Sequence, residues 1–280
     1  MSIIELINSG RINEYTANSG NLGGLRKFHN NVKLNLIMSS TEKIGAINLL
    51  DIGVGRGGDL FKWSKAGIIN VTGIDSDTDS IYATRNKNGF DGAVIRYCQT
   101  KKKSEVPKCF FWKMSATDPS TLRELNKKDF NLMYDIVSSQ FSFHYFVKDI
   151  DVTLELVKNK LKVGGLFIGT AADGDLIKAN LESGDISFPF LRITKIDSSG
   201  YSFNLNVEQH GTESYFQIKG ESFEYFLLKD FLVEKAKEHS LELVKMENFS
   251  EHYSKSGFTL SEEEKLCSFL NFSFVFKRIN

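Results

Sequence analysis

The chain has 280 residues, of which 41% are hydrophobic and 25% charged, and its 35 Lys and Arg residues balance its 35 Asp and Glu residues. This composition is that of a globular protein, and zero net charge argues against a protein that coats long nucleic acid, so we expect any nucleic-acid contact to be local. No apolar run approaches the ~18–20 residues that cross a bilayer, and three cysteines without a C-x-x-C pair argue against a zinc site or disulfides, so we expect a protein of a reducing compartment without membrane or metal.

Strands alternate with helices in the first part of the chain. Mixed helical spacing predicts a helix over 25–38, and short apolar runs that end in an acid predict buried strands over 46–51 and 68–75. The other elements expected before residue 171 are helices over 59–66, 76–87 and 152–161 and strands over 110–114, 135–139 and 166–170. This alternation is typical of an α/β fold with a mostly parallel sheet.

After residue 180 the pattern becomes that of antiparallel strands. A half-exposed strand is predicted where apolar and polar residues alternate, at Tyr201, Phe203, Leu205 and Val207, with 215–218 as its partner. A helix over 231–239, a strand over 241–246 and a last strand over 272–276 follow. We therefore expect a β-rich insertion at about 185–225, after which the chain returns to the main sheet.

A glycine-rich loop joins the first predicted strand to the next helix. Gly53, Gly55 and Gly58 satisfy G-x-G-x-x-G, and glycines there let the backbone turn sharply and approach a ligand closely. The pattern alone is compatible with dinucleotide binding, or with a turn that merely packs a helix on a sheet.

Two acids narrow these alternatives. Asp51 precedes the first glycine by two residues, where a carboxylate would repel a pyrophosphate but suits an amino group and a cationic sulfur. Asp75 ends the second strand, where a carboxylate can accept both hydroxyls of a ribose. Together they indicate a nucleoside joined to an amino acid, S-adenosylmethionine, and they place an NAD oxidoreductase last.

Several segments resemble one family, in the same order along the chain. The loop LLDIGVGRGGDLFKW (49–63) is similar to D-x-G-x-G-K/R-G-G-D-L-x-K-W of the mRNA cap (guanine-N7) methyltransferases. Further similar segments are LRKFHNNVK (25–33), SQFSFHY (139–145), GGLFIGT (164–170), SFEYFL (222–227) and HY (252–253). The resemblance implies the Rossmann-like fold of class I methyltransferases, which use S-adenosylmethionine, with helices on both faces of the sheet.

The resemblance also implies which residues hold the methyl donor. Lys33 would neutralise its carboxylate, Asp51 and Gly53 would hold its methionine part, and Asp75 would bind its ribose. The remaining donor-binding residues are Gly55, Gln140, Tyr145 and either Thr117 or Asp118, one of which would contact the adenine amino group.

For the acceptor, the resemblance implies contacts with the cap. The expected residues are His144, Tyr145, Glu224 and Tyr253 around the guanine, Asn30 and Arg56 at sugar and phosphates, and Arg85 or Lys87 at further phosphates. A carboxylate such as Glu224 can accept from guanine N1–H and N2–H₂ together, which adenine does not offer. Plainer interpretations stay open: a partly buried histidine for His144, a solvated helix face for Glu224 and packing for Tyr253. His29, Asn31 and Ala172 depart from the family pattern.

The expected reaction transfers a methyl group from S-adenosylmethionine to N7 of the guanosine cap by in-line displacement. N7 carries a lone pair and no proton, so we expect no catalytic acid or base, and positioning by His144, Tyr145 and Glu224 instead. The alternatives are a methyltransferase acting on a protein or small molecule and a non-catalytic capping subunit.

We expect one methyltransferase domain over 1–280. It would comprise an N-terminal helical segment (1–45), a donor-binding core (46–184), the β-rich insertion (185–225) and a C-terminal return (226–280). The expected partner is the 5′ cap of mRNA (GpppN-RNA). Triphosphatase and guanylyltransferase domains would accompany it in a viral capping enzyme acting in the host cytoplasm or virion, whereas a cellular protein would act in the nucleus.

Overall fold

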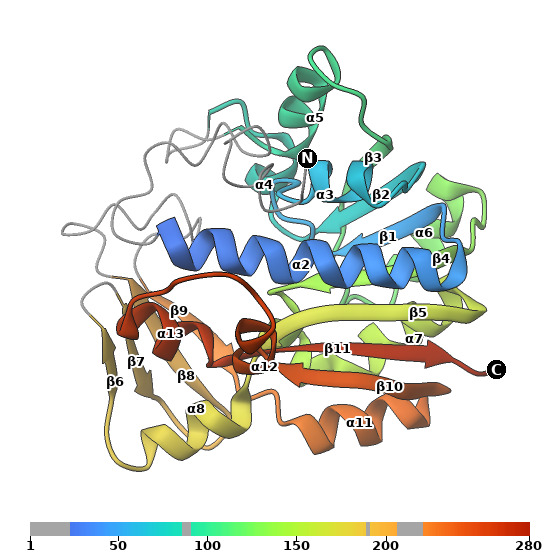
Figure 1. Ribbon diagram of the computed structural model, residues 1–280. Coiled ribbons are helices and arrows are strands. Elements are labelled where there is room, and N and C mark those ends of the chain that lie inside the picture. The colour runs from blue at the N-terminus through green and yellow to red at the C-terminus, as the bar shows by residue number, and fades with distance from the viewer. Residues whose placement is uncertain (1–22, 86–90, 189–190, 206–220) are drawn as a thin grey trace. The chain divides into compact units, whose positions relative to one another are not determined.

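The computed structural model describes residues 23–85, 91–188, 191–205 and 221–280 (Figure 1). The chain divides into two compact units, which we name by their sheets. The parallel-sheet unit comprises Lys33–Ala171, Leu227–Met246 and Ser273–Asn280, and the antiparallel-sheet unit comprises Met1–Val32, Ala172–Phe226 and Glu247–Phe272. Each unit joins segments far apart in the sequence, so no local pattern could delimit it.

Seven of the described strands form the main sheet, in the order β10-β11-β5-β4-β1-β2-β3. Their bounds are β1 Asn48–Ile52, β2 Asn70–Asp75, β3 Lys108–Lys113, β4 Tyr134–Gln140, β5 Leu161–Ala172, β10 Leu241–Asn248 and β11 Asn271–Arg278. β1 pairs in parallel with β2 and β4, and parallel pairing continues to β3 and to β5. The chain therefore leaves β1 on one side and resumes at β4 on the other, and such a switch point is where parallel sheets bind ligands, beyond the carboxyl ends of the strands.

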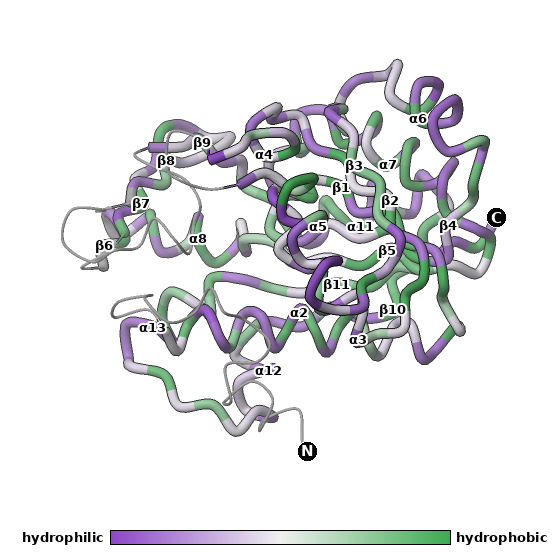
Figure 2. The backbone as a smooth tube through the Cα atoms, turned by 90° about the horizontal axis from the view of Figure 1, so that it is seen from above, coloured by the Kyte–Doolittle hydropathy of each residue, from purple (hydrophilic) through white to green (hydrophobic). Residues whose placement is uncertain are grey.

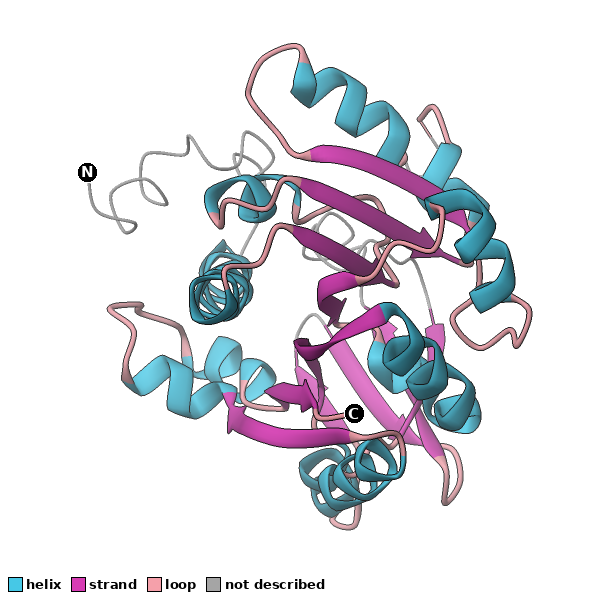
Figure 3. Cartoon of the chain, turned by 90° about the vertical axis from the view of Figure 1, so that its right-hand side faces the viewer, coloured by secondary structure: helices cyan, strands magenta, loops and turns pink. Residues whose placement is uncertain are grey.

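Helices lie on both faces of this sheet (Figure 3), which confirms the expected α/β class. Those of the parallel-sheet unit are α3 Leu60–Lys65, α4 Thr78–Tyr82, α5 Ala93–Lys101, α6 Thr121–Asp129, the 3₁₀ helix η2 Phe143–Asp149, α7 Ile150–Lys160 and α11 Lys229–Glu238. A buried apolar cluster that includes Trp63, Ile81 and Ala93 joins α3, α4 and α5 to the sheet. Helix α7 contacts both α6 and α11.

Helix α2 (Gly23–Ile44) is longer than the predicted 25–38 and belongs to both units. Hydrophobic and hydrophilic residues follow one another closely along it (Figure 2). Leu34, Leu36 and Ile37 are all buried, so the helix is covered on more than one side. That explains why its apolar spacing does not form a single stripe.

The helix predicted over 76–87 is wrong in length. The Asp77 side chain caps α4 by accepting from the amides of Asp79 and Ser80, but at Ala83 the backbone becomes extended, with ψ 136°, and the helix ends after Tyr82. Helices α5 and α6 were not predicted, and β5 begins at Leu161 rather than 166 because the chain leaves α7 directly in an extended conformation. Lys87 lies outside the described residues.

The β-rich insertion forms a separate antiparallel sheet in the order β6-β7-β8-β9. Its strands are β6 Ile186–Phe188, β7 Leu191–Lys195, β8 Gly200–Leu205 and β9 Glu221–Tyr225. β8 confirms the predicted alternating strand up to Leu205, and it pairs with β7 and β9. The predicted partner 215–218 and Val207 lie outside the described residues. The same unit holds α8 Gly174–Leu181, α12 Phe249–Ser254 and α13 Glu262–Ser268.

Candidate functional site

The glycine loop follows β1 at the switch point of the sheet. The amides of Gly53 and Val54 donate to the Ile74 carbonyl, at 2.9 and 3.0 Å, which ties the loop to the end of β2. Gly53 has φ 72°, and a Cβ there would lie 2.5 Å from both Cβ and Oγ of Ser142. The position therefore requires glycine for its conformation and for space.

Asp75 fixes the other side of the loop. Its Oδ2 accepts from the Gly55 amide at 2.8 Å, and its Oδ1 accepts from the Asp77 amide at 2.9 Å. Burial raises the pKa of the Asp75 carboxyl, and these backbone hydrogen bonds oppose the change by favouring the charged form. The side chain remains partly exposed at the carboxyl end of β2, as binding of a ribose would require.

Asp51 is a buried acid with an unsatisfied oxygen. The residue is 2% exposed, and within the described part of the chain its Oδ1 has no hydrogen-bond partner. Burial raises the pKa of this carboxyl well above its ordinary value, Asp59 adds to the effect, and a hydrogen bond from Ser138 opposes it. A buried acceptor without a donor costs free energy, so the site suits a ligand that brings an N–H group.

Two lysines and an acid form an ion cluster beside the loop. The Asp59 Oδ1 atom lies 2.8 Å from Nζ of both Lys33 and Lys62. Although burial opposes ionisation of Asp59, the two ammonium groups outweigh it and hold the pKa of its carboxyl well below the usual range. Burial also lowers the pKa of Lys62 to about 8. Lys33 therefore brings a positive charge to this region, but it is engaged by Asp59.

The last residue of β4 and the turn that follows it connect β4, β5 and β1. Gln140 donates through Nε2 to Ser138 Oγ at 3.1 Å and accepts at Oε1 from Thr170 Oγ1 at 3.1 Å. Phe141 has φ 56°, and Ser142 Oγ then donates to the Ile52 carbonyl at 3.0 Å. The Q-F-S turn thus holds the end of β1 in place.

Helix η2 places His144 and Tyr145 next to each other in different environments. Their ring centroids are 4.3 Å apart, with His144 buried and Tyr145 39% exposed. The Tyr145 ring is therefore the more accessible of the two. Burial of His144 agrees with a positioning role and equally with an ordinary buried histidine, so its role stays a prediction.

The two candidates for adenine contact differ in surroundings. Thr117 is half-buried, and its Oγ1 shares a hydrogen bond with Ser115 Oγ at 2.8 Å. Asp118 is exposed, and its Oδ1 accepts from the Ser120 amide at 2.8 Å, in the turn that precedes α6. Either could contact a base, and the choice between them stays open.

Arg56 is more restricted than expected for a phosphate ligand. It is buried, and its Nε and one terminal nitrogen donate to the Asp91 carbonyl at 2.8 and 2.6 Å. Arg85 is exposed, with φ 46°, and its amide donates to Asp91 Oδ1 at 3.0 Å. Of the two expected further phosphate partners, Arg85 is therefore the accessible one that the structure describes.

The remaining predicted cap residues lie in the antiparallel-sheet unit. Glu224 belongs to strand β9 and is 5% exposed, so the alternative of a solvated helix face is wrong. Its Oε2 accepts from the Tyr201 hydroxyl at 2.7 Å, across the β8–β9 pair. Tyr253, on α12, packs edge-to-face on Phe28 at 5.7 Å, and Asn30 is half-buried on α2.

His29, one of the departures from the family pattern, has a structural role. Its Nε2 shares a 2.9 Å hydrogen bond with Ser268 Oγ, and its ring meets Phe249 edge-on at 5.1 Å.

Three neighbours of the donor-binding residues were not predicted from the sequence: Asp59, Lys62 and Ser142. Asp59 and Lys62 are letters of the quoted glycine-loop motif, which is the signal that could have found them. Ser142 is an unassigned position of the SQFSFHY segment, and its contact with Gly53 arises only when β4 and β1 lie side by side.

Within the described ranges, no group of three or more His, Cys, Asp or Glu side chains could hold a metal ion. None of the described helices is both long and apolar enough to cross a membrane.

The chain resembles known capping proteins in sequence. A family model, the mRNA (guanine-N(7))-methyltransferase domain, matches residues 11–275. A probable mRNA-capping enzyme of Acanthamoeba polyphaga mimivirus is 30% identical over 86% of this chain and 23% of its own length. An mRNA cap guanine-N(7) methyltransferase of Caenorhabditis briggsae is 30% identical over 81% of this chain and 60% of its own length. The chain thus spans less than two thirds of either relative.

Solved structures agree on the fold. An S-adenosylmethionine-dependent methyltransferase from Clostridium acetobutylicum aligns with a TM-score of 0.55 at 13% identity, over 87% of this chain and 89% of that one. A Burkholderia thailandensis N1-methyltransferase, solved with bound S-adenosylhomocysteine, aligns with a TM-score of 0.51 at 10% identity, over 99% and 85% of the two chains. The chain therefore has the methyltransferase fold and belongs to the mRNA (guanine-N(7))-methyltransferase domain family.

Proposed function

We propose that this chain transfers the methyl group of S-adenosylmethionine to N7 of the guanosine that caps mRNA. Membership of the guanine-N7 family supports the donor and the acceptor class. The structural observation that carries the proposal is the unsatisfied Oδ1 of buried Asp51, at the carboxyl end of β1. Its carboxylate suits the donor's amino group, and Asp75, one strand away, suits the ribose hydroxyls.

The donor residues all lie in the parallel-sheet unit. We propose that Gly53 and Gly55 let the backbone approach the donor, while Lys33 balances its carboxylate from the ion cluster with Asp59. The other proposed contacts are Gln140, Tyr145 and either Thr117 or Asp118. Because both the nitrogen and the oxygen of the Gln140 amide are hydrogen-bonded, the orientation of this side chain is fixed.

For the cap, we propose the contacts that the family resemblance implies, from His144, Tyr145, Arg56, Asn30, Glu224 and Tyr253. The Tyr201 hydroxyl orients the Glu224 carboxylate through Oε2. A carboxylate held in this way can accept from guanine N1–H and N2–H₂, and it would leave adenine unmatched. Guanine selectivity is therefore expected to depend on Glu224.

The transfer itself needs no acid, base or nucleophile from the protein. S-adenosylmethionine supplies a methyl group already activated by a positive sulfur. As the lone pair of N7 forms the new N–C bond, the S–C bond breaks and sulfur keeps its electron pair, so no proton moves. The protein contributes position and alignment, which can lower a barrier by ~7–11 kcal/mol.

The larger setting is also a proposal. The mimivirus capping enzyme is longer than this chain by a wide margin, which supports neighbouring triphosphatase and guanylyltransferase domains in the same polypeptide. We propose that residues 1–280 act as one methyltransferase domain, in the cytoplasm or virion if the source is viral and in the nucleus if it is cellular.

The proposal is tested by incubating the chain with methyl-labelled S-adenosylmethionine and three acceptors: GpppG-capped RNA, ApppG-capped RNA and a protein mixture. We expect label only with the GpppG cap, and nuclease digestion should locate it on N7 of the terminal guanine. Label in protein would support the runner-up methyltransferase. Absence of donor binding by calorimetry would support the non-catalytic subunit.

A further inference from the structure

An exposed phenylalanine ends helix α6 in an unfavourable conformation. Phe130 is 90% exposed, and its φ of 54° and ψ of 43° are left-handed. Helices usually place Gly or Asn there, because a Cβ is disfavoured in this region. A bulky aromatic ring that is both strained and solvated adds little to folding, and such outliers gather at ligand contacts.

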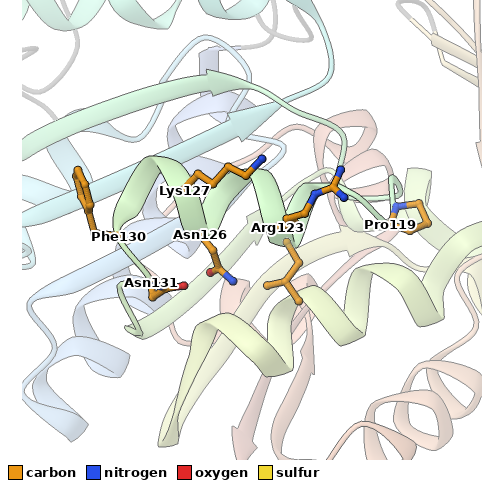
Figure 4. A pocket seen from close by; sticks show the side chains of 7 residues that line it. Pro119, Arg123, Asn126, Lys127, Phe130 and Asn131 are labelled. Atoms are coloured by element: carbon orange, nitrogen blue, oxygen red, sulfur yellow. The ribbon is translucent and has the colours of Figure 1, made fainter.

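Two cations lie on the same side of α6 as this ring. Arg123 and Lys127 precede Phe130 by seven and three residues, a spacing that places all three along one helical stripe, and Figure 4 shows them in succession. Their side chains are 73% and 62% exposed. Both contact Glu124, but ion pairs this exposed are weak and leave the cations available to a stronger anion.

Neighbouring groups add to the positive character of this helix end. Lys128 is exposed, with Nζ 4.9 Å from the centre of the Trp112 ring. The acid that follows it, Asp129, points inward, where it binds Lys160 at 2.8 Å and accepts from the Tyr134 hydroxyl. The outer surface thus carries an excess of cations beside an aromatic ring.

The same side chains line a pocket along the helix. Its wall includes Pro119, Leu122, Arg123, Lys127 and Phe130 (Figure 4). The pocket begins one residue after Asp118, a candidate contact for the donor's adenine. The surface therefore starts next to the proposed donor-binding residues and runs away from them along α6.

We propose that Arg123, Lys127 and Phe130, the α6 surface, bind the single-stranded RNA that follows the cap. A base stacks on Phe130 while the two cations contact phosphates, the combination that non-specific single-strand binders use. Charge favours RNA over an apolar protein segment, because cations flank the ring. The inference rests on the proposed function, which makes capped RNA the substrate.

The test measures binding of an uncapped, fluorescein-labelled single-stranded RNA to the full chain by fluorescence anisotropy, over a range of salt concentrations. Phe130→Leu should weaken binding by about fivefold or more, since Leu has no π-face, whereas Phe130→Trp should bind at least as well as the wild type. Arg123→Gln with Lys127→Gln should reduce the salt slope by about 1.4, which corresponds to two phosphate contacts on a single strand. The matched control, Lys237→Gln with Lys277→Gln, removes two exposed lysines elsewhere and should leave the slope as in the wild type.

The inference is overturned if the wild type does not bind the RNA, if Phe130→Leu binds as tightly as the wild type, or if the α6 pair changes the slope no more than the control pair. Tolerance of Leu would indicate an apolar protein contact instead. Methylation separates this inference from the proposed function, because the variants should retain wild-type activity on the GpppG dinucleotide. A wild type inactive on GpppG that still showed the predicted RNA-binding pattern would refute the proposed function and leave the α6 surface standing.

Discussion

Replacing Gly53 by alanine tests whether the loop after β1 is built around close backbone approach. The substitution places a Cβ in the left-handed region, at φ 72°, which costs ~1–2 kcal/mol. The same Cβ would lie 2.5 Å from two atoms of Ser142, and overpacking of this kind costs ~1–3 kcal/mol more. We expect Gly53→Ala to lower the free energy of unfolding by roughly 2–5 kcal/mol.

Urea unfolding measures this loss, and Gly45→Ala is the matched control. Gly45 has φ 63°, but an added methyl group would meet no described atom within 4 Å, so its variant should lose only the conformational part, ~1–2 kcal/mol. Ser142→Gly alone loses the hydrogen bond to the Ile52 carbonyl, so the clash is read from the cost of Gly53→Ala in that background, which should fall to the conformational part. If Gly53→Ala costs no more than Gly45→Ala in the wild type, or costs as much with Gly at position 142 as with Ser, the close approach of Ser142 to the loop is not as described.

Four further outcomes are expected. Asp51→Asn should stabilise the ligand-free chain at neutral pH. Burial raises the pKa of the Asp51 carboxyl, so the folded chain loses stability as the pH rises above the ordinary carboxyl range, and Asn, which does not ionise, removes that loss. The same variant should bind S-adenosylhomocysteine roughly tenfold to a hundredfold more weakly by calorimetry, and unchanged affinity would contradict the assignment. Glu224→Ala should lose cap methylation while donor affinity survives, and a normal rate on capped RNA would refute its acceptor role. Iodoacetamide at mildly alkaline pH should modify the exposed Cys98 and spare Cys109 and Cys267. Burial raises the pKa of these two thiols to about 12, so neither is ionised at that pH. Mass spectrometry of the alkylated native protein should therefore find one adduct, at Cys98.

Most of the parallel sheet could be predicted because its strands are short apolar runs, two of which end in an acid, at Asp51 and Asp75. Helix α6 was missed because only Thr121 and Leu125 of its residues are buried, which is too few for a periodic apolar stripe. Helix α4 was predicted too long because it ends where the backbone at Ala83 becomes extended, and alanine is not a residue that indicates the end of a helix.

The site was predictable at Asp51, Gly53 and Asp75, because these residues follow from the strand–loop pattern and the motif alone. What the sequence could not provide was the partner of each group. The guanidinium of Arg56 is held by the Asp91 carbonyl, 35 residues away, and a backbone acceptor leaves no mark in a sequence pattern. Likewise, the burial of Glu224 and its bond to Tyr201 follow from the pairing of β9 with β8, and Tyr201 lies in none of the segments that carry the resemblance.

The most direct test of the donor site is a crystal structure of the chain with S-adenosylhomocysteine. We expect the ligand's amino nitrogen within hydrogen-bond distance of Asp51 Oδ1, its ribose hydroxyls hydrogen-bonded to Asp75, and its amino-acid part packed against Gly53. A ligand bound elsewhere, with Asp51 Oδ1 still without a donor, would show that the donor site is wrongly assigned.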